Sequence, residues 1–213
     1  MPTINELLEK CNDFHSREHR HLAFPFASWI CKEDLGTGIS FLLSVWNVRW
    51  SGRKEFSDVL QTQVAQALKE SEDILNKLDQ HMLENDTWNK KRDEVVKIFE
   101  VFEQRPAIRI TGASKALHLL KPDLFVMWDG DIREKKYKIN TSQYRPNGKK
   151  YLEFLEKCRE FAKDILNQIT KEELLNEHYS RLNQTTKRCY QLFSYHESLP
   201  KMIDEFNYAV VRW

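Results

Sequence analysis

Helical periodicity runs through almost the whole of this 213-residue chain. In residues 4–17, for example, Leu7, Leu8, Cys11 and Phe14 fall on one face of a helix. No convincing alternation of apolar and polar residues appears, although residues 124–128, LFVMW, could be extended over a short distance. The sequence therefore predicts an all-α fold of about ten helices, with a helix-hairpin-helix-like element in residues 110–133.

Proline and turn residues divide this pattern into segments. Arg105-Pro106 and Lys121-Pro122 should end helices, because proline disfavours helix in the residue before it. The stretch 21–30 resembles a proline-interrupted connection. We expect one globular unit, residues 1–213, with subdomains 36–105 (an inner helical bundle) and 1–35 plus 106–213 around a cleft. The expected helices lie near residues 4–17, 38–50, 51–71, 70–83, 86–104, 110–120, 129–137, 149–168, 171–185, 186–194 and 201–211.

The charge balance limits the kind of partner. With 33 basic and 32 acidic side chains the formal net charge is +1, so a nucleic-acid site must be a local patch. No run of about 18 apolar residues occurs, and the N-terminus lacks the form of a signal peptide. The four cysteines are widely spaced, which is typical of reduced thiols. We expect a cytoplasmic protein, associated with the nucleoid or nucleus if it acts on DNA.

Residues 110–133, ITGASKALHLLKPDLFVMWDGDIR, hold the most suggestive combination of side chains. The spacing predicts a tight turn at Gly112 that leads into a helix, with Lys115 in its first turn. The helix dipole would there disfavour the protonated amine, and only a neutral amine is a nucleophile. Asp129 should stand at the next helix start. The residues alone leave a second interpretation open, in which Lys115 is solvated and Asp129 is an N-cap.

This segment resembles the helix-hairpin-helix DNA glycosylases, the superfamily of endonuclease III and 8-oxoguanine glycosylases. ITGASKA resembles the hairpin turn and the lysine that follows it, and VMWDGDIR resembles the aspartate segment, with Ile132 and Arg133 in matching order. The resemblance implies a glycosylase with AP-lyase activity, in which Lys115 and Asp129 are catalytic and Gly112 and Ser114 contact DNA. It also implies a damaged, oxidised base as the substrate.

Three departures from the family pattern stand out. The lysine and the aspartate are 14 positions apart, about one helical turn fewer than is usual in the family, which keeps the helix face in phase. The turn lacks the family's Gly-x-Gly pattern, with Ser114 near the place of the second glycine, and the family's phosphate contact at the helix start is expected to differ here. The cysteines that hold an iron–sulfur centre in some members are absent, and we expect no cofactor.

A second similarity lies in FLLSVWNVRW, residues 41–50, which resembles the family's early buried helix and its DNA-penetrating loop. It makes Trp46, Asn47 and Arg49 candidates for probing the duplex or lining a base pocket. Trp128, directly before the aspartate, is a further candidate for the base pocket. Core packing is the alternative for any of the aromatic residues, since such side chains dominate buried area.

Residues 133–150 are rich in lysine and arginine, with Tyr137 and Tyr144 among them. A basic patch beside the proposed site is what phosphate contacts require, although a solvated surface loop has the same composition. We expect the partner to be double-stranded DNA that contains a damaged base, bound by a monomer. The DNA-contact candidates here are Arg133, Lys135, Lys136, Lys138, Arg145 and Lys149.

Cys11, His15 and His19 share a helix face, as some metal ligands do. No second ligand group of comparable spacing follows in the sequence, so we expect no metal. The alternative to a DNA glycosylase is a non-catalytic helical module that binds nucleic acid or another protein. It would retain the helices and the basic patch without the lysine chemistry.

Overall fold

The computed structural model describes residues 2–46, 54–79, 81–141 and 146–213. Within these ranges the regular structure is helical and contains no strand, which confirms the predicted all-α class. No helix there is long and apolar enough to cross a membrane. The helices are α1 (Ile4–Arg17), α2 (Ala23–Cys31), α3 (Leu35–Trp46), α4 (Lys54–Lys77), α5 (Arg92–Glu103), α6 (Arg109–Leu120), α7 (Gly148–Leu166), α8 (Lys171–Arg181), α9 (Gln184–Leu192) and α10 (Leu199–Arg212), with short helical turns η1 (Asp86–Lys91) and η2 (Ile132–Lys136).

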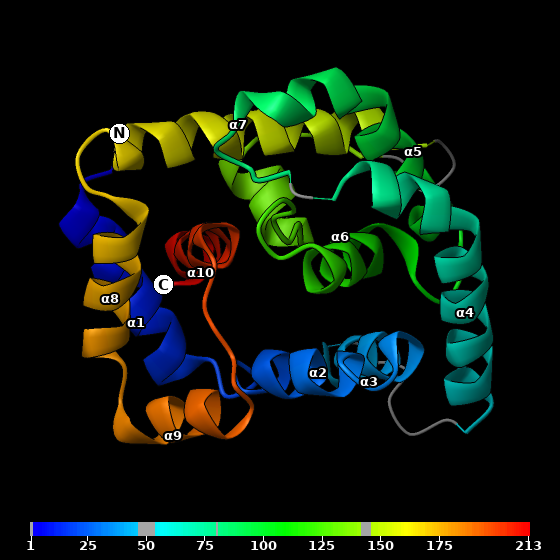
Figure 1. Cartoon of the computed structure of the whole chain (residues 1–213), viewed down its shortest axis with the longest axis horizontal. Helices are drawn as coiled ribbons and strands as arrows, with labels where there is room; N and C mark the ends of the chain where they lie inside the picture. The colour runs from blue at the N-terminus through cyan, green and yellow to red at the C-terminus, as the bar shows by residue number, and fades with distance from the viewer. Residues whose placement is uncertain (1, 47–53, 80, 142–145) are drawn as a thin grey trace.

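The C-terminal helix α10 lies at the centre of the molecule. It packs against α1, α7 and η2, and Figure 1 shows it inside a frame of other helices. Every residue from Leu199 to Ala209 is buried, so the helix has no solvent face over that length. A helix buried on all sides is ordinarily apolar, yet this one carries Lys201, Asp204 and Glu205. Because buried charges need ion-pair or hydrogen-bond partners, we expect polar networks between α10 and the helices around it.

The N-terminal half differs from the sequence-based expectation in two elements. Residues 21–30 are mostly helix α2 and not an irregular connection, because Pro25 falls in the first turn, where no amide donor is needed. The two helices expected at 51–71 and 70–83 are largely one helix, α4, since no proline or glycine separates them. Gly38 lets α3 approach α2: a Cβ there would lie 2.8 Å from the Ala27 carbonyl oxygen. The proposed division into subdomains stays a prediction.

The stretch 124–128 forms neither helix nor strand and is buried between α6 and α7. The Trp128 amide donates to Ser114 Oγ (2.9 Å), and the Tyr151 hydroxyl donates to the Val126 carbonyl oxygen (2.8 Å). These bonds satisfy backbone groups that belong to no helix or sheet. They also fix the end of the stretch, and therefore Asp129, against helix α6.

Candidate active site around Lys115

Lys115 lies in the second turn of α6, not in the first. The helix begins at Arg109, so the amides of residues 113–115 bond to carbonyls of the preceding turn. The predicted turn at Gly112 and the phosphate-accepting helix start after it are therefore wrong. Lys115 itself is only 6% exposed. Its chemistry is set by this burial and by its neighbours, since the helix end is too far away.

The amine of Lys115 sits over an aromatic ring. Its Nζ lies 4.4 Å from the centre of the Trp46 ring at the end of α3. Among the described residues it forms no hydrogen bond and no ion pair within 4.0 Å. Burial lowers the pKa of Lys115, and the attraction of Asp129 and Asp204 offsets that effect only in part. A buried amine of lowered pKa is more often neutral at physiological pH, which is the state a nucleophile requires.

Asp129 caps a turn and also acts electrostatically on Lys115, while its catalytic role stays a prediction. Its Oδ1 accepts a hydrogen bond from the Ile132 amide (3.1 Å), so the carboxylate caps the turn that leads into η2. Its Oδ2 forms no hydrogen bond within the described ranges. Its charge is also the largest influence that favours protonated Lys115. In the structure the predicted lysine and aspartate are therefore close enough for the charge of Asp129 to act on the pKa of Lys115.

A second carboxylate, which the sequence analysis missed, faces the same amine. Asp204 on α10 is 5% exposed, and burial raises its pKa to about 6. The amine of Lys201 lies 3.3 Å from its Oδ2. The sequence does contain an indication of this carboxylate. Lys201, Asp204 and Glu205 stand within an otherwise apolar helical segment, and charged residues in a buried helix indicate paired charges in the core.

Three predicted contact residues are enclosed by the protein. Gly112 lies inside α6, and Ser114 is fully buried with its hydroxyl donating to the Thr111 carbonyl oxygen (3.0 Å). Trp128 has no exposed surface and stacks on Phe154 (ring centres 5.5 Å apart), so it is a core residue. The three residues are therefore buried in this structure, and the expectations for Gly112 and Ser114 as DNA contacts and for Trp128 as a pocket residue stay predictions without support from it. Asn47, Arg49 and Arg145 lie outside the described residues.

The predicted basic segment divides into inward-facing and outward-facing side chains. Arg133 donates to Thr111 Oγ1 (3.3 Å) and to the Trp128 carbonyl oxygen (3.4 Å), which ties η2 to α6. Lys136 donates to Asn207 Oδ1 (2.5 Å) on α10, and burial lowers its pKa to about 8. The exposed members of the set are Lys135, Lys138 and Lys149.

No protein-family model, no curated protein and no solved structure matches this chain. A functional proposal therefore rests on the geometry around Lys115 and on the sequence motif.

Proposed function

We propose that this protein is a DNA repair glycosylase that excises a damaged, oxidised base and cleaves the abasic site through a Schiff base on Lys115. The supporting observation is the buried amine of Lys115, which has no hydrogen bond or ion pair among the described residues, whose pKa is lowered and whose charge interacts with Asp129. A lysine nucleophile needs this combination, because burial disfavours the protonated amine while a carboxylate can stabilise positive charge that develops on the sugar.

In the proposed reaction the damaged nucleotide is rotated out of the duplex. Asp129 stabilises positive charge at the sugar C1′ while the bond between C1′ and the base breaks. Lys115 Nζ forms a bond to C1′, and loss of a proton and ring opening give the Schiff base. Loss of a proton from C2′ and of the 3′ phosphate then breaks the strand by β-elimination.

The proposal assigns supporting roles to three kinds of neighbour. Trp46, whose ring covers Lys115 Nζ, must move off the amine or stack on the extruded base. Lys135, Lys138 and Lys149 are exposed and are assigned to phosphate contacts. Asp204 is a second carboxylate that attracts the protonated amine.

The test is covalent trapping with borohydride, which reduces a Schiff base to a stable amine. A duplex with a preformed abasic site comes first, because it needs no knowledge of the damaged base, and a panel of oxidised bases follows. Wild-type protein should give a covalent adduct, and Lys115→Met should give none while still binding DNA. Lys121→Met is the matched control: it changes the lysine directly after the same helix, which pairs with Asp79 (2.7 Å).

Two outcomes would overturn the proposal. Wild-type protein that traps on no abasic or damaged duplex would end the lyase assignment, and DNA binding without trapping would favour the non-catalytic helical module. Equal trapping by wild type and Lys115→Met would move the nucleophile to another amine. Circular dichroism of each variant shows that loss of trapping is not loss of folding.

A further inference from the structure

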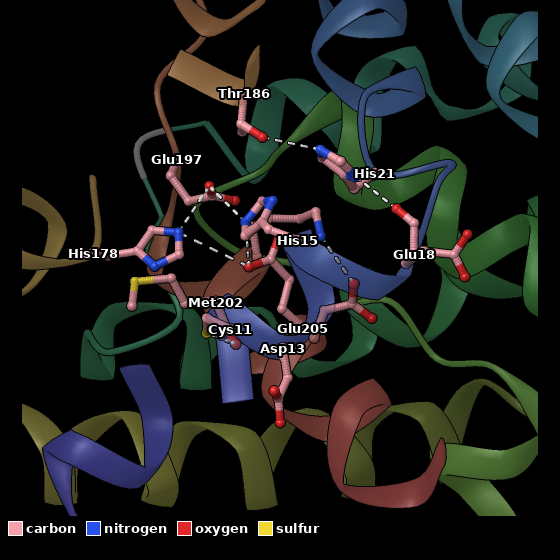
Figure 2. Close-up of polar contacts among 12 residues, drawn as sticks. Cys11, Asp13, His15, Glu18, His21, His178, Thr186, Glu197, Met202 and Glu205 are labelled. Atoms are coloured by element: carbon pink, nitrogen blue, oxygen red, sulfur yellow. Dashed lines mark hydrogen bonds and ion pairs between the residues drawn. The ribbon is translucent and has the colours of Figure 1, made fainter. Parts of the chain in front are cut away.

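A second buried polar cluster lies away from Lys115, between the N-terminal and C-terminal helices. It joins His15 of α1, His178 of α8, Glu197 in the stretch between α9 and α10, and Glu205 of α10. One potential ligand atom from each residue lies within 4.8 Å of the others. Figure 2 shows the four side chains converging on one point from these four segments.

The distances between these atoms fit one metal ion. His15 Nε2 lies 3.0 Å from Glu205 Oε2 and 3.9 Å from Glu197 Oε2, while His178 Nε2 lies 3.3 Å and 4.0 Å from Glu197 Oε2 and Glu205 Oε2. A tetrahedron with metal–ligand bonds of about 2.1 Å has edges of roughly 3.4 Å. The four distances bracket that edge, so small movements would place all four atoms around a common centre.

The hydrogen bonding of the cluster is incomplete. His15 Nε2 and Glu205 Oε2 are close but lack hydrogen-bond geometry, and both atoms are buried with no hydrogen-bond partner among the described residues. Buried polar atoms without partners are costly, and native proteins rarely leave them so. A shared metal ion would satisfy both atoms, because it takes a lone pair from each.

The surroundings resemble the outer shell of a metal site. The Tyr190 hydroxyl donates to Glu197 Oε2 (2.5 Å), and Lys201 Nζ donates to Glu205 Oε1 (2.9 Å), so each carboxylate is held in place. Such outer partners orient metal ligands. Two carboxylates and two neutral imidazoles carry a charge of −2, which one divalent cation neutralises.

Part of the cluster borders a surface cavity. His178, Tyr190 and Glu197 all line a surface cavity of about 840 Å³ formed by α8, α9 and the stretch after α9. Two of the four proposed ligands, His178 and Glu197, therefore border this cavity, while His15 and Glu205 lie behind them.

We propose that His15, His178, Glu197 and Glu205 bind one zinc ion in a four-ligand structural site. Zinc is chosen because it prefers tetrahedral coordination by nitrogen and oxygen ligands, and because four protein ligands describe a structural site. The ion would tie the N-terminal helix α1 to α8 and α10. The proposal is independent of the chemistry assigned to Lys115.

The full-length protein is stripped with a chelator and titrated with zinc against a chromophoric chelator, and with cobalt(II), whose visible absorption reports tetrahedral geometry. Wild type should bind one ion per chain and give the tetrahedral cobalt spectrum. His178→Gln and Glu197→Gln should bind zinc at least about 100-fold more weakly and lose that spectrum. Zinc in hundredfold excess over its dissociation constant should raise the wild-type melting temperature by roughly 5–10 °C.

Two matched controls lie in the same cavity. His196→Gln and Glu172→Gln change residues that line it but are not in the cluster, and both should bind zinc as wild type does. Wild-type protein that takes up no stoichiometric zinc would overturn the proposal and leave a network of histidines and carboxylates joined by ion pairs and hydrogen bonds. Equal zinc affinity in ligand and control variants would also overturn it. Because Glu197→Gln keeps the size of the side chain, its cobalt spectrum remains informative even if its stability falls.

Discussion

At the residue scale, the defining feature is a lysine where a core would ordinarily hold an apolar side chain. Burial of Lys115 outweighs the attraction of Asp129 and Asp204, and the amine has no ion-pair partner within 4.0 Å among the described residues. Replacing this buried amine with an apolar side chain of similar length should therefore stabilise the fold. We predict that Lys115→Met raises the free energy of unfolding by about 1 kcal/mol while it abolishes trapping. Urea denaturation at neutral pH measures the difference.

The control for this prediction is again Lys121→Met. Lys121 is partly exposed and forms a surface ion pair, so the change should alter stability by no more than about 0.5 kcal/mol. A loss of more than about 1 kcal/mol in Lys115→Met would contradict the prediction, because it would show that the amine holds the fold together.

The two roles of Asp129 can be separated by two substitutions. Asparagine keeps an oxygen that can cap the Ile132 amide but removes the charge, whereas alanine removes both. Because the carboxylate favours protonated Lys115, Asp129→Asn should lower the pKa of Lys115 further. We predict that trapping on preformed abasic DNA then reaches its maximum at a lower pH than in wild type, while base release becomes slower.

Trapping rates measured as a function of pH test this prediction. Asp129→Ala should show the same shift toward lower pH together with a loss of stability of about 1 kcal/mol from the missing cap. Unchanged pH profiles in both variants would reduce Asp129 to a cap.

At the scale of elements, the site depends on how α6 holds the stretch 124–128. The Ser114 hydroxyl accepts from the Trp128 amide and donates to the Thr111 carbonyl oxygen, and all of this is buried. We predict that Ser114→Ala costs about 1–3 kcal/mol of unfolding free energy, because the Trp128 amide loses its partner. It should also lower trapping, since Asp129 directly follows this stretch. Chemical denaturation and the trapping assay measure the two effects.

Ser180→Ala is the comparison for Ser114→Ala. Its hydroxyl donates to the Glu177 carbonyl oxygen on the exposed face of α8, where water can replace it. Equal losses of unfolding free energy in the two variants would contradict the prediction that the buried hydrogen bond between the Trp128 amide and Ser114 stabilises the fold.

The same helix shows what periodicity predicts and what it misses. The existence of a helix over 110–120 followed from its apolar pattern and from Lys121-Pro122 after it. Its start did not, because Gly112 resembles a turn residue in the sequence. In the structure Gly112 serves packing: a Cβ there would lie 3.0 Å from Ile108 Cγ2 and 3.6 Å from Leu43 Cδ2 on α3. The tight contact is with Ile108, the N-cap residue of the same helix, whereas the distance to Leu43 is ordinary van der Waals contact. How the Ile108 side chain packs beside Gly112 depends on the folded structure and is not encoded in the apolar pattern.

At the scale of the whole molecule, tertiary structure joins residues that the sequence keeps far apart. Lys115 and Asp129 lie only 14 positions apart in the sequence and were predicted as a pair. Asp204 on α10, far away in the sequence, also attracts the Lys115 amine. His15 likewise meets Glu205 only because α1 packs on α10. Short spacing along α1 joins His15 only with Cys11 and His19, whereas the residues that meet His15 in the cluster come from the last third of the chain.

The acid stability of the whole fold depends in part on a buried histidine between α6 and the stretch 124–128. His118 has no exposed surface, and its Nδ1 lies 2.5 Å from the Phe125 carbonyl oxygen, to which it donates. Burial lowers the pKa of His118 from 6.5 to about 3. Between these two pH values the unfolded chain therefore binds a proton that the folded chain does not, and stability falls as the pH falls.

We predict that this histidine alone lowers the free energy of unfolding by roughly 1.4 kcal/mol for each pH unit below about 6.5, until the pH approaches about 3. His118→Gln can still donate to the Phe125 carbonyl oxygen but does not titrate. The variant should be less stable than wild type at neutral pH. Its free energy of unfolding should also fall less steeply with acid, by roughly 1.4 kcal/mol per pH unit, because one proton fewer is taken up on unfolding. Urea denaturation of both proteins between pH about 7 and about 4.5 measures the two slopes. Parallel slopes would show that His118 takes up its proton in the folded state as readily as in the unfolded chain.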